Sequence, residues 1–386
     1  MASLDGRKPG PTDEGDASAR RYNRGWRARF GPGGRVTNEL ARFLAGLPGE
    51  APCGLLDAWR RSAAWMNYAD AFARAYAVFQ DRCADPFSRW AHSVSRPAWR
   101  ERSVFYPFSG PDFLFAQFLH PAAETYMLCG RERWTPLPSP PDVEDVAMLA
   151  VLTPLGEFVE PYLTGGFFVT QDMAAWLASH ADFGIAHILL ALASRQGFSV
   201  PSVRIVWVDH EGRLTANAGC HATTGICIDL QRSGRAVRVL YFQHDLRNGY
   251  FSPASPLAKF VAAAAPCLSL CKCASYLPHE PEFSDFGRFM LGISSALVQD
   301  ASGVPYRLLK DGDWDIALHG RYATPLRVFE RYDQPDLSEA FDRAAATTKS
   351  LEFSVGYGRN TQRAGLIVAR SPTPIDGGGM FRPMLK

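Results

Sequence analysis

The stretch from Ser103 to Glu132 constrains the fold more than any other part of this 386-residue chain, and it reads SVFYPFSGPDFLFAQFLHPAAETYMLCGRE. A β-rich apolar run, Val104–Phe108, breaks at the turn Ser109–Asp112. An amphipathic run follows at Phe113–Leu119, and a second β-rich run occupies Thr125–Cys129. This order predicts strand, tight turn, helix and strand, the opening unit of a doubly wound α/β sheet.

The turn and the acid after the second strand are the first candidate ligand groups. In doubly wound sheets, the turn holds a ligand at a helix N-terminus, and the acid accepts hydrogen bonds from ribose hydroxyls. The corresponding residues here are Ser109, Gly110 and Asp112 in the turn and Glu132 after the strand. The turn has one glycine where a dinucleotide-binding turn usually has three, so the full glycine fingerprint is absent.

A structural role competes with ligand binding at this turn. Asp112, or Ser109 together with Asp112, stands where a helix cap is expected, and Pro111 falls in the first helical turn, where proline is tolerated. The residues alone leave both roles open. The position of the turn, after a buried strand in the middle of the chain, favours ligand binding.

Composition excludes several classes of protein. About 47% of the residues are apolar and 21% are charged, so the chain can bury a large core and is globular. The 41 basic and 39 acidic residues nearly cancel, which excludes a nucleic-acid footprint across the whole surface. The N-terminus lacks the apolar core of a signal peptide, and no apolar run of about 18 residues exists to span a membrane. The sequence therefore predicts a soluble, cytoplasmic protein with no membrane or nucleic-acid partner.

The chain divides into four predicted regions. Residues 1–34 form a disordered tail, 35–100 a helical N-terminal region, 101–370 an α/β domain and 371–386 a C-terminal tail. The first tail is rich in Gly, Pro, Asp and Arg and has little apolar surface to bury. An alternative interpretation is a basic-aromatic arm that binds an anionic partner, because Tyr22, Trp26 and Phe30 lie among five arginines. These are Arg20, Arg21, Arg24, Arg27 and Arg29.

Strand and helix alternate again between residues 237 and 322. Patterns of apolar residues predict strands at Val237–Phe242, Leu268–Leu277 and Trp314–His319, with helices at Pro256–Ala265 and Ser284–Val298 between them. Such alternation is typical of an α/β sheet covered by helices.

Part of the sheet is expected to be antiparallel. Three runs with strand-like alternation, Val203–Asp209, Ile226–Leu230 and Val237–Phe242, are separated by turns at Glu211-Gly212 and Ser233-Gly234, which predict hairpins. The predicted fold is therefore α/β with a Rossmann-like, methyltransferase-like mixed sheet and a helical N-terminal region. We expect Val104–Phe108, Thr125–Cys129, Val237–Phe242 and Leu268–Leu277 to share one sheet.

Polar side chains that follow predicted strands are the candidate catalytic residues. His244 and Asp245 follow one strand and His279 follows the next, where open α/β sheets place their ligand groups. In one crevice, they would hold or deprotonate a second substrate. Further candidates are Asp300, Ser302 and Arg321.

Metal binding is an alternative use of the same residues. His244, Asp245, His279, Asp300 and His319 would suit iron or zinc if the strands brought them together, but no pair has the local spacing of a known metal motif. The cysteines Cys220, Cys227, Cys267, Cys271 and Cys273 lie in strand-like contexts, which favours core packing over a zinc site. No nucleophile elbow and no phosphate-binding loop of the P-loop type occurs.

Several strings resemble segments that occur in the same order in a group of uncharacterised bacterial proteins. They are VFYPFSGPDFL, CASYLPH, LVQDASGVPYRLL, WDIALHGRY and QPDL, and the resemblance runs from Trp59 to Arg370. The group brings no known activity with it. This chain departs from the pattern at Arg131, where the relatives have Leu, and at Ala301, where an acid is usual, so an acidic role at position 301 is not expected here. The relatives are often preceded by export signals.

Together these features predict a protein that binds a nucleoside-bearing small molecule, with S-adenosylmethionine as the first candidate, at the Ser109–Asp112 turn and Glu132. A methyltransferase-like enzyme is one form of this hypothesis. A non-catalytic ligand-binding or sensing protein is the alternative, and a metal-dependent enzyme that uses the strand-end His and Asp residues is a third. Whether the protein is an enzyme stays open.

Overall fold

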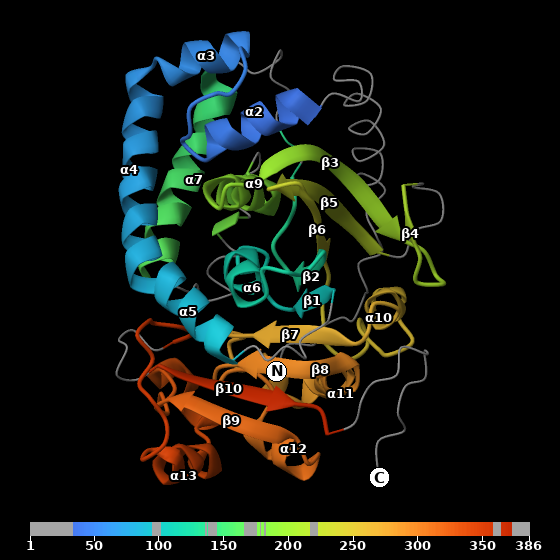
Figure 1. Cartoon of the computed structure of the whole chain (residues 1–386). Coiled ribbons are helices and arrows are strands. Elements are labelled where there is room, and N and C mark those ends of the chain that lie inside the picture. Colours follow the sequence, from blue (N-terminus) through green and yellow to red (C-terminus); the bar gives the residue numbers. More distant parts are fainter. Residues whose placement is uncertain are drawn as a thin grey trace, which may run out of the picture.

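The structure is a computed structural model, and it describes residues 34–94, 102–135, 145–165, 183–216, 223–357 and 364–372, with a few single positions between them. These residues form a ten-stranded sheet with helices packed on both faces (Figure 1). The predicted tails, 1–34 and 371–386, lie outside the described residues except at their innermost positions. Among the described helices, none is long and apolar enough to cross a membrane.

Five parallel strands form the centre of the sheet. In spatial order they are β6 (Arg235–Gln243), β2 (Thr125–Gly130), β1 (Ser103–Tyr106), β7 (Cys267–Cys271) and β8 (Ser294–Gln299). Because these five strands are parallel, their carboxyl ends all lie at one edge of the sheet.

Antiparallel strands complete the sheet on both sides. Beyond β8 lie β10 (Gly365–Arg370) and then β9 (Asp315–Gly320). Beyond β6 lie β5 (Thr223–Arg232), β3 (Ser199–Val208) and the short β4 (Leu214–Thr215). The two predicted hairpins are confirmed, because β3 pairs with β4 and β5 pairs with β6 in antiparallel register.

The strand order defines the type of fold. Numbered along the chain without the β3–β5 insertion, the strands lie in the order 3-2-1-4-5-7-6, and the seventh, β10, is antiparallel to its neighbours. The prediction of a Rossmann-like mixed sheet is confirmed. The connection after β1 leads to β2 on one side, and the connection after β7 leads to β8 on the opposite side. The topological switch point, where such sheets bind ligands, therefore lies between β1 and β7.

Helices from the first half of the chain cover one face. They are α2 (Gly34–Leu44), α3 (Gly54–Arg60), α4 (Ala63–Phe79), α5 (Asp85–Val94), α6 (Phe113–Leu119), α7 (Asp145–Gly165) and α9 (Ile185–Arg195), and the π-helical turn Gln80–Ala84 joins α4 to α5. In α4, Trp65, Ala69, Phe72 and Phe79 recur at helical spacing and are buried. Figure 1 shows α4 and α7 side by side at the outer edge of this layer.

Helices from the second half cover the other face. They are α10 (Pro256–Ala262), α11 (Ser284–Ile293), α12 (Tyr306–Asp311) and α13 (Pro335–Ala344). Alternation along the central strands divides the core between the two layers: Val104 and Tyr106 of β1 belong to the first, and Phe105 belongs to the second. The four segments predicted to share a sheet do so, and α6 has its predicted limits.

Three predicted elements need correction. The strand predicted at Leu268–Leu277 ends at Cys271, because the residues after it adopt left-handed backbone conformations. The helix predicted at Ser284–Val298 ends at Ile293 and passes directly into β8, a strand that the apolar run concealed. The residues Val143–Thr153 predict a helix that ends before Pro154, but α7 continues through Pro154 and Pro161.

Candidate functional site

The turn after β1 is held in a strained and crowded conformation. Phe108 has a positive φ of 72°, which is unfavourable for a residue with a side chain. A Cβ atom on Gly110 would lie 2.4 Å from Cγ1 of Ile185, so only glycine fits this position. The Gly110 N–H donates a hydrogen bond to Oε1 of Glu132 at 3.4 Å. The turn and the acid that the sequence predicted as neighbours are therefore in contact.

Glu132 is almost completely buried beside this turn, with 1% of its surface exposed. Its Oε2 accepts a hydrogen bond from the Tyr241 hydroxyl at 2.8 Å. The carboxylate also folds back over Gly130, where a Cβ atom would lie 1.8 Å from Oε2. Burial raises the pKa of Glu132 to about 7, although the hydrogen bonds from Tyr241 and Gly110 oppose the shift.

Asp112 does not cap α6. It occupies the N-cap position, but its side chain makes no capping hydrogen bond. Its carboxylate instead forms a buried ion pair with Lys272, with Oδ1 3.0 Å from Nζ. Capping is therefore wrong as the explanation of Asp112, whereas direct recognition of a ligand by its charge stays a prediction.

Two tyrosines complete the surroundings of this ion pair. The Tyr162 hydroxyl donates to Oδ1 of Asp112 at 2.9 Å, and the Tyr106 hydroxyl donates to Oδ2. Burial alone would lower the pKa of Lys272, but Asp112 outweighs it and raises the pKa, so the ammonium group keeps its proton. Because Asp112 follows β1 and Lys272 follows β7, this network spans the topological switch point.

The loop after β7 concentrates backbone strain. Cys273, Ser275 and Tyr276 have positive φ angles of 49°, 53° and 56°, and each conformation costs roughly 1–2 kcal/mol for a residue with a side chain. Hydrogen bonds from neighbouring segments hold the loop. Asp300 accepts from the Cys273 N–H at 3.0 Å, and Tyr357 accepts from the Ser275 N–H at 3.1 Å. Such strain persists only where the surroundings enforce it, and it is often found at functional sites.

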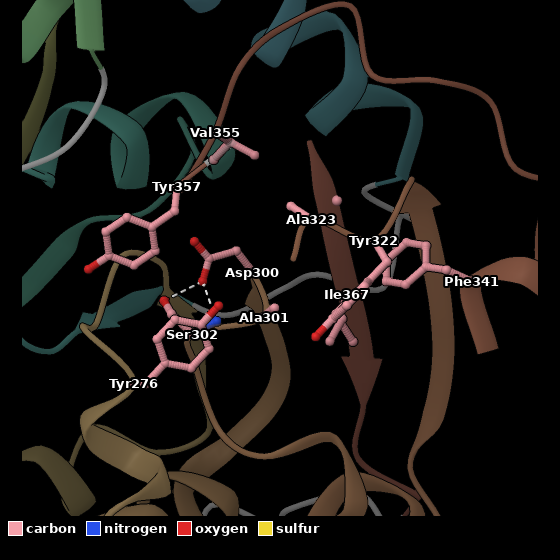
Figure 2. Close-up of a pocket in the computed structure, with 11 residues that line it drawn as sticks. Tyr276, Asp300, Ala301, Ser302, Tyr322, Ala323, Phe341, Val355, Tyr357 and Ile367 are labelled. Atoms are coloured by element: carbon pink, nitrogen blue, oxygen red, sulfur yellow. Dashed lines mark hydrogen bonds between the residues drawn. The ribbon is translucent and has the colours of Figure 1, made fainter. Parts of the chain in front are cut away.

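A small cavity lies next to this loop (Figure 2). Its volume is about 20 Å³, which is room for one water molecule. Figure 2 shows Asp300 beside the rings of Tyr276 and Tyr357, hydrogen-bonded to Ser302. The Tyr276 and Tyr357 rings are nearly parallel, with centroids 6.1 Å apart. Burial raises the pKa of Asp300. The structure therefore brings Asp300 and Ser302 together, as two groups that fix the β7 and β8 loops.

The three predicted catalytic residues follow two strands that are not neighbours in the sheet. His244 and Asp245 follow β6, whereas His279 follows β7, and β2 and β1 lie between these strands. Asp245 forms an ion pair with Arg247 at 2.5 Å. Burial lowers the pKa of His244, and it lowers that of His279 to about 4. The ring of His279 packs against Tyr276, 5.2 Å away between centroids. The loops after β6 and β7 meet, because the Asn248 N–H donates a hydrogen bond to the Glu282 carbonyl at 2.6 Å, so the expectation of one crevice stays a prediction.

The remaining candidates lie apart from this network. The side chain of Arg321 is exposed, and Ser109 is half-buried with no side-chain hydrogen bond to a described residue. His319 packs against Trp90, with ring centroids 5.4 Å apart. No three His, Cys, Asp or Glu side chains come together as potential metal ligands in the described part of the chain. Cys227, Cys267, Cys271 and Cys273 are buried free thiols, as expected for core packing, and Cys220 lies outside the described residues.

Sequence reasoning missed the residues that complete the network. Lys272 is the most informative, because a lysine between two cysteines at the end of an apolar strand is rare in a core unless it is paired. Tyr106 was visible only as part of a β-rich run, and Tyr162 reaches Asp112 from α7, fifty residues away along the chain.

No family model, curated protein or solved structure matches this chain.

Proposed function

We propose that this protein binds a nucleoside-bearing small molecule at the carboxyl edge of its parallel strands, with S-adenosylmethionine as the first candidate. The observation that carries the proposal is the contact between the Gly110 N–H and the Glu132 carboxylate. In Rossmann-like sites, the backbone of the first turn and the acid after the second strand bind adjoining parts of one nucleoside ligand. The order of the strands, with β10 antiparallel between β8 and β9, supports the same class by layout.

Glu132 has the chemistry that a ribose requires. An ionised carboxylate only accepts hydrogen bonds, and the two ribose hydroxyls are donors. On binding, these hydroxyls replace the donors that Glu132 now uses, the Gly110 N–H and the Tyr241 hydroxyl. Because burial raises the pKa of Glu132 to about 7, the site also offers a proton-linked step, in which ligand binding favours the ionised carboxylate.

The ion pair between Asp112 and Lys272 has a positioning role in this proposal. It joins the turn after β1 to the end of β7 and holds both next to the ligand. Asp112 therefore supports the Gly110 turn and leaves direct contact with the ribose to Glu132. The strained loop Cys273–Tyr276, on the other side of the switch point, is the position for the reacting part of a second substrate.

A non-catalytic binding or sensing protein is the second candidate function. Two observations favour it: Asp245 is neutralised by Arg247, and the low pKa of His279 makes it a weak base near neutral pH. Neither residue is suited to remove a proton from a substrate at the switch point. The enzyme and the sensor would bind the same ligand, but only the enzyme would convert it.

A thermal-shift screen tests the shared part of the proposal. The full chain is mixed in turn with S-adenosylmethionine, adenosine, NAD and divalent metal ions, and its melting temperature is measured. We expect S-adenosylmethionine or adenosine to raise it, because a ligand that binds only the native state stabilises it. Glu132→Gln should weaken that ligand's binding by about 10- to 100-fold, the loss expected when charged hydrogen bonds become neutral.

Two outcomes would count against the proposal. One is stabilisation by a metal alone, and the other is a nucleoside response that Glu132→Gln leaves unchanged. If binding is found, a methyl-transfer assay that follows consumption of S-adenosylmethionine with candidate acceptors separates the enzyme from the sensor.

A further inference from the structure

Helices α4 and α7 form a groove that is separate from the carboxyl edge of the sheet. Its volume is about 370 Å³, and the two helices supply all of its described lining. Three small residues, Ala64 and Ala71 on α4 and Gly156 on α7, leave the space open. The groove therefore has the shape that receives a third, packed segment.

The floor of this groove is apolar and buried, and its ends are apolar and accessible. Leu149 of α7 lines it and is 43% exposed. Val78 is 42% exposed and lies two helical turns beyond Ala71, on the same face of α4. Tyr68 and Phe72 contribute aromatic surface to the lining. Apolar side chains of this size gain free energy when another chain segment covers them.

The rim of the groove is acidic. Glu157 and Glu160 line it, both are exposed, and the described lining contains no lysine, arginine or histidine. Neither carboxylate forms an ion pair with a described residue. A segment that fits here should carry positive charge beside its apolar side chains.

One segment of this chain has that chemistry. Residues 20–30, RRYNRGWRARF, contain five arginines and no acid. Tyr22, Trp26 and Phe30 are spaced four residues apart, so in a helix they lie along one face, with arginines on the others. This is the pattern of an amphipathic segment that binds in a helical groove.

The segment is also close enough to reach the groove. The described chain begins at Gly34, the first residue of α2. The other end of α2 contacts the groove wall, because the Tyr68 hydroxyl donates a hydrogen bond to the Leu44 carbonyl. An 11-residue helix is about 15 Å long, and four extended residues span up to about 14 Å, so the segment that ends at Phe30 can lie against α4.

We propose that residues 20–30 bind in the groove between α4 and α7 of their own chain, with Tyr22, Trp26 and Phe30 toward the apolar floor and the arginines toward Glu157 and Glu160. This interaction is independent of the nucleoside proposal, because it uses another face of the molecule. A second copy of the chain or another basic protein segment is the competing occupant.

Hydrogen exchange of the full chain, followed by mass spectrometry, tests the proposal. We expect the amides of residues 20–30 to exchange at least about tenfold more slowly than in the isolated 18–32 peptide. Glu157→Lys combined with Glu160→Lys should remove this protection, as should Trp26→Ala. The matched control is Asp311→Lys with Asp342→Lys, which makes the same charge change at two exposed acids of α12 and α13 and should leave the protection intact.

Each outcome of the hydrogen-exchange experiment either supports or overturns binding of residues 20–30 in the groove. Protection of the α4 amides in every variant shows that the fold is retained. An unprotected 20–30 segment in the unmodified chain, or protection that survives the reversal of both glutamates, would overturn the proposal. Protection that increases with protein concentration would overturn the same-chain form and assign the groove to a second copy.

Discussion

Lys272 and Asp112 form a buried ion pair across the switch point of the sheet, with Nζ 3.0 Å from Oδ1 and at most 5% of either side chain exposed. The pair joins the end of β7 to the turn after β1, two segments that lie 160 residues apart along the chain. The Nζ atom also lies 4.0 Å from the centroid of the Phe115 ring. The edge at which a doubly wound sheet binds its ligand is thus fixed by an internal charge pair.

This pair predicts a large effect of substitutions at Asp112. Asp112→Asn leaves the Lys272 ammonium buried without a counter-charge, and we expect a loss of about 3–5 kcal/mol in the free energy of unfolding. Adding Lys272→Met should recover part of that loss, with a coupling energy of about 1–3 kcal/mol in a double-mutant cycle. Urea unfolding at neutral pH gives the free energy of unfolding of the unmodified protein, the two single variants and the double variant. Almost no loss for Asp112→Asn would indicate a simple helix cap, because asparagine caps about as well as aspartate, and would contradict the account.

The second prediction concerns the contact between Gly110 and Ile185. Gly110→Ala places a methyl group within 2.4 Å of Cγ1 of Ile185, and overpacking of this kind costs about 1–3 kcal/mol. Replacing Ile185 by Ala in the same chain should relieve the clash, so the combined loss will be less than the sum of the two. Gly54→Ala is the matched control, because a Cβ atom there meets nothing within 4 Å. Equal melting temperatures for the Gly110 and Gly54 variants would be inconsistent with the packed turn.

The third prediction is a pH dependence that originates at Glu132. Burial raises the pKa of this group from 4.5 to about 7. Between these values the unfolded carboxyl loses its proton while the folded one keeps it, so stability falls as pH rises. The loss is complete above about pH 7 and is of the order of 3 kcal/mol.

Glu132→Gln isolates this effect, because glutamine does not titrate. Urea unfolding at pH 5 and pH 8 should show that the unmodified protein loses more stability than Glu132→Gln over this interval. Parallel behaviour of the two proteins would mean that Glu132 has an ordinary pKa in the folded state.

The sequence predicted the central unit well because its signals are local. The apolar runs of β1 and β2, the Ser109–Asp112 turn and the amphipathic pattern of α6 all lie within thirty residues. The predicted neighbourhood of Gly110 and Glu132 follows from that unit alone. The α11 to β8 junction was missed because the apolar run was read as one continuous helix, although Gly292 stands one residue before α11 ends.

The buried network could not be predicted because its determinants are tertiary. Lys272, Tyr162 and Asp112 come from three separate segments, and only the folded sheet brings them together. The left-handed residues Ser275 and Tyr276 carry no glycine or asparagine signal, since neighbouring hydrogen bonds and ring packing enforce their conformation.

Calorimetric titration with S-adenosylmethionine at pH 7, in two buffers of different ionisation enthalpy, tests the central claim most directly. Burial raises the pKa of Glu132 to about 7, so part of the free protein carries a protonated carboxyl at this pH. Ribose hydroxyls that bind the carboxylate favour its ionised form, so we expect saturable binding with release of protons. Glu132→Gln should bind more weakly and release none. Binding without proton release, release that persists in Glu132→Gln, or no binding of S-adenosylmethionine or adenosine would contradict the account.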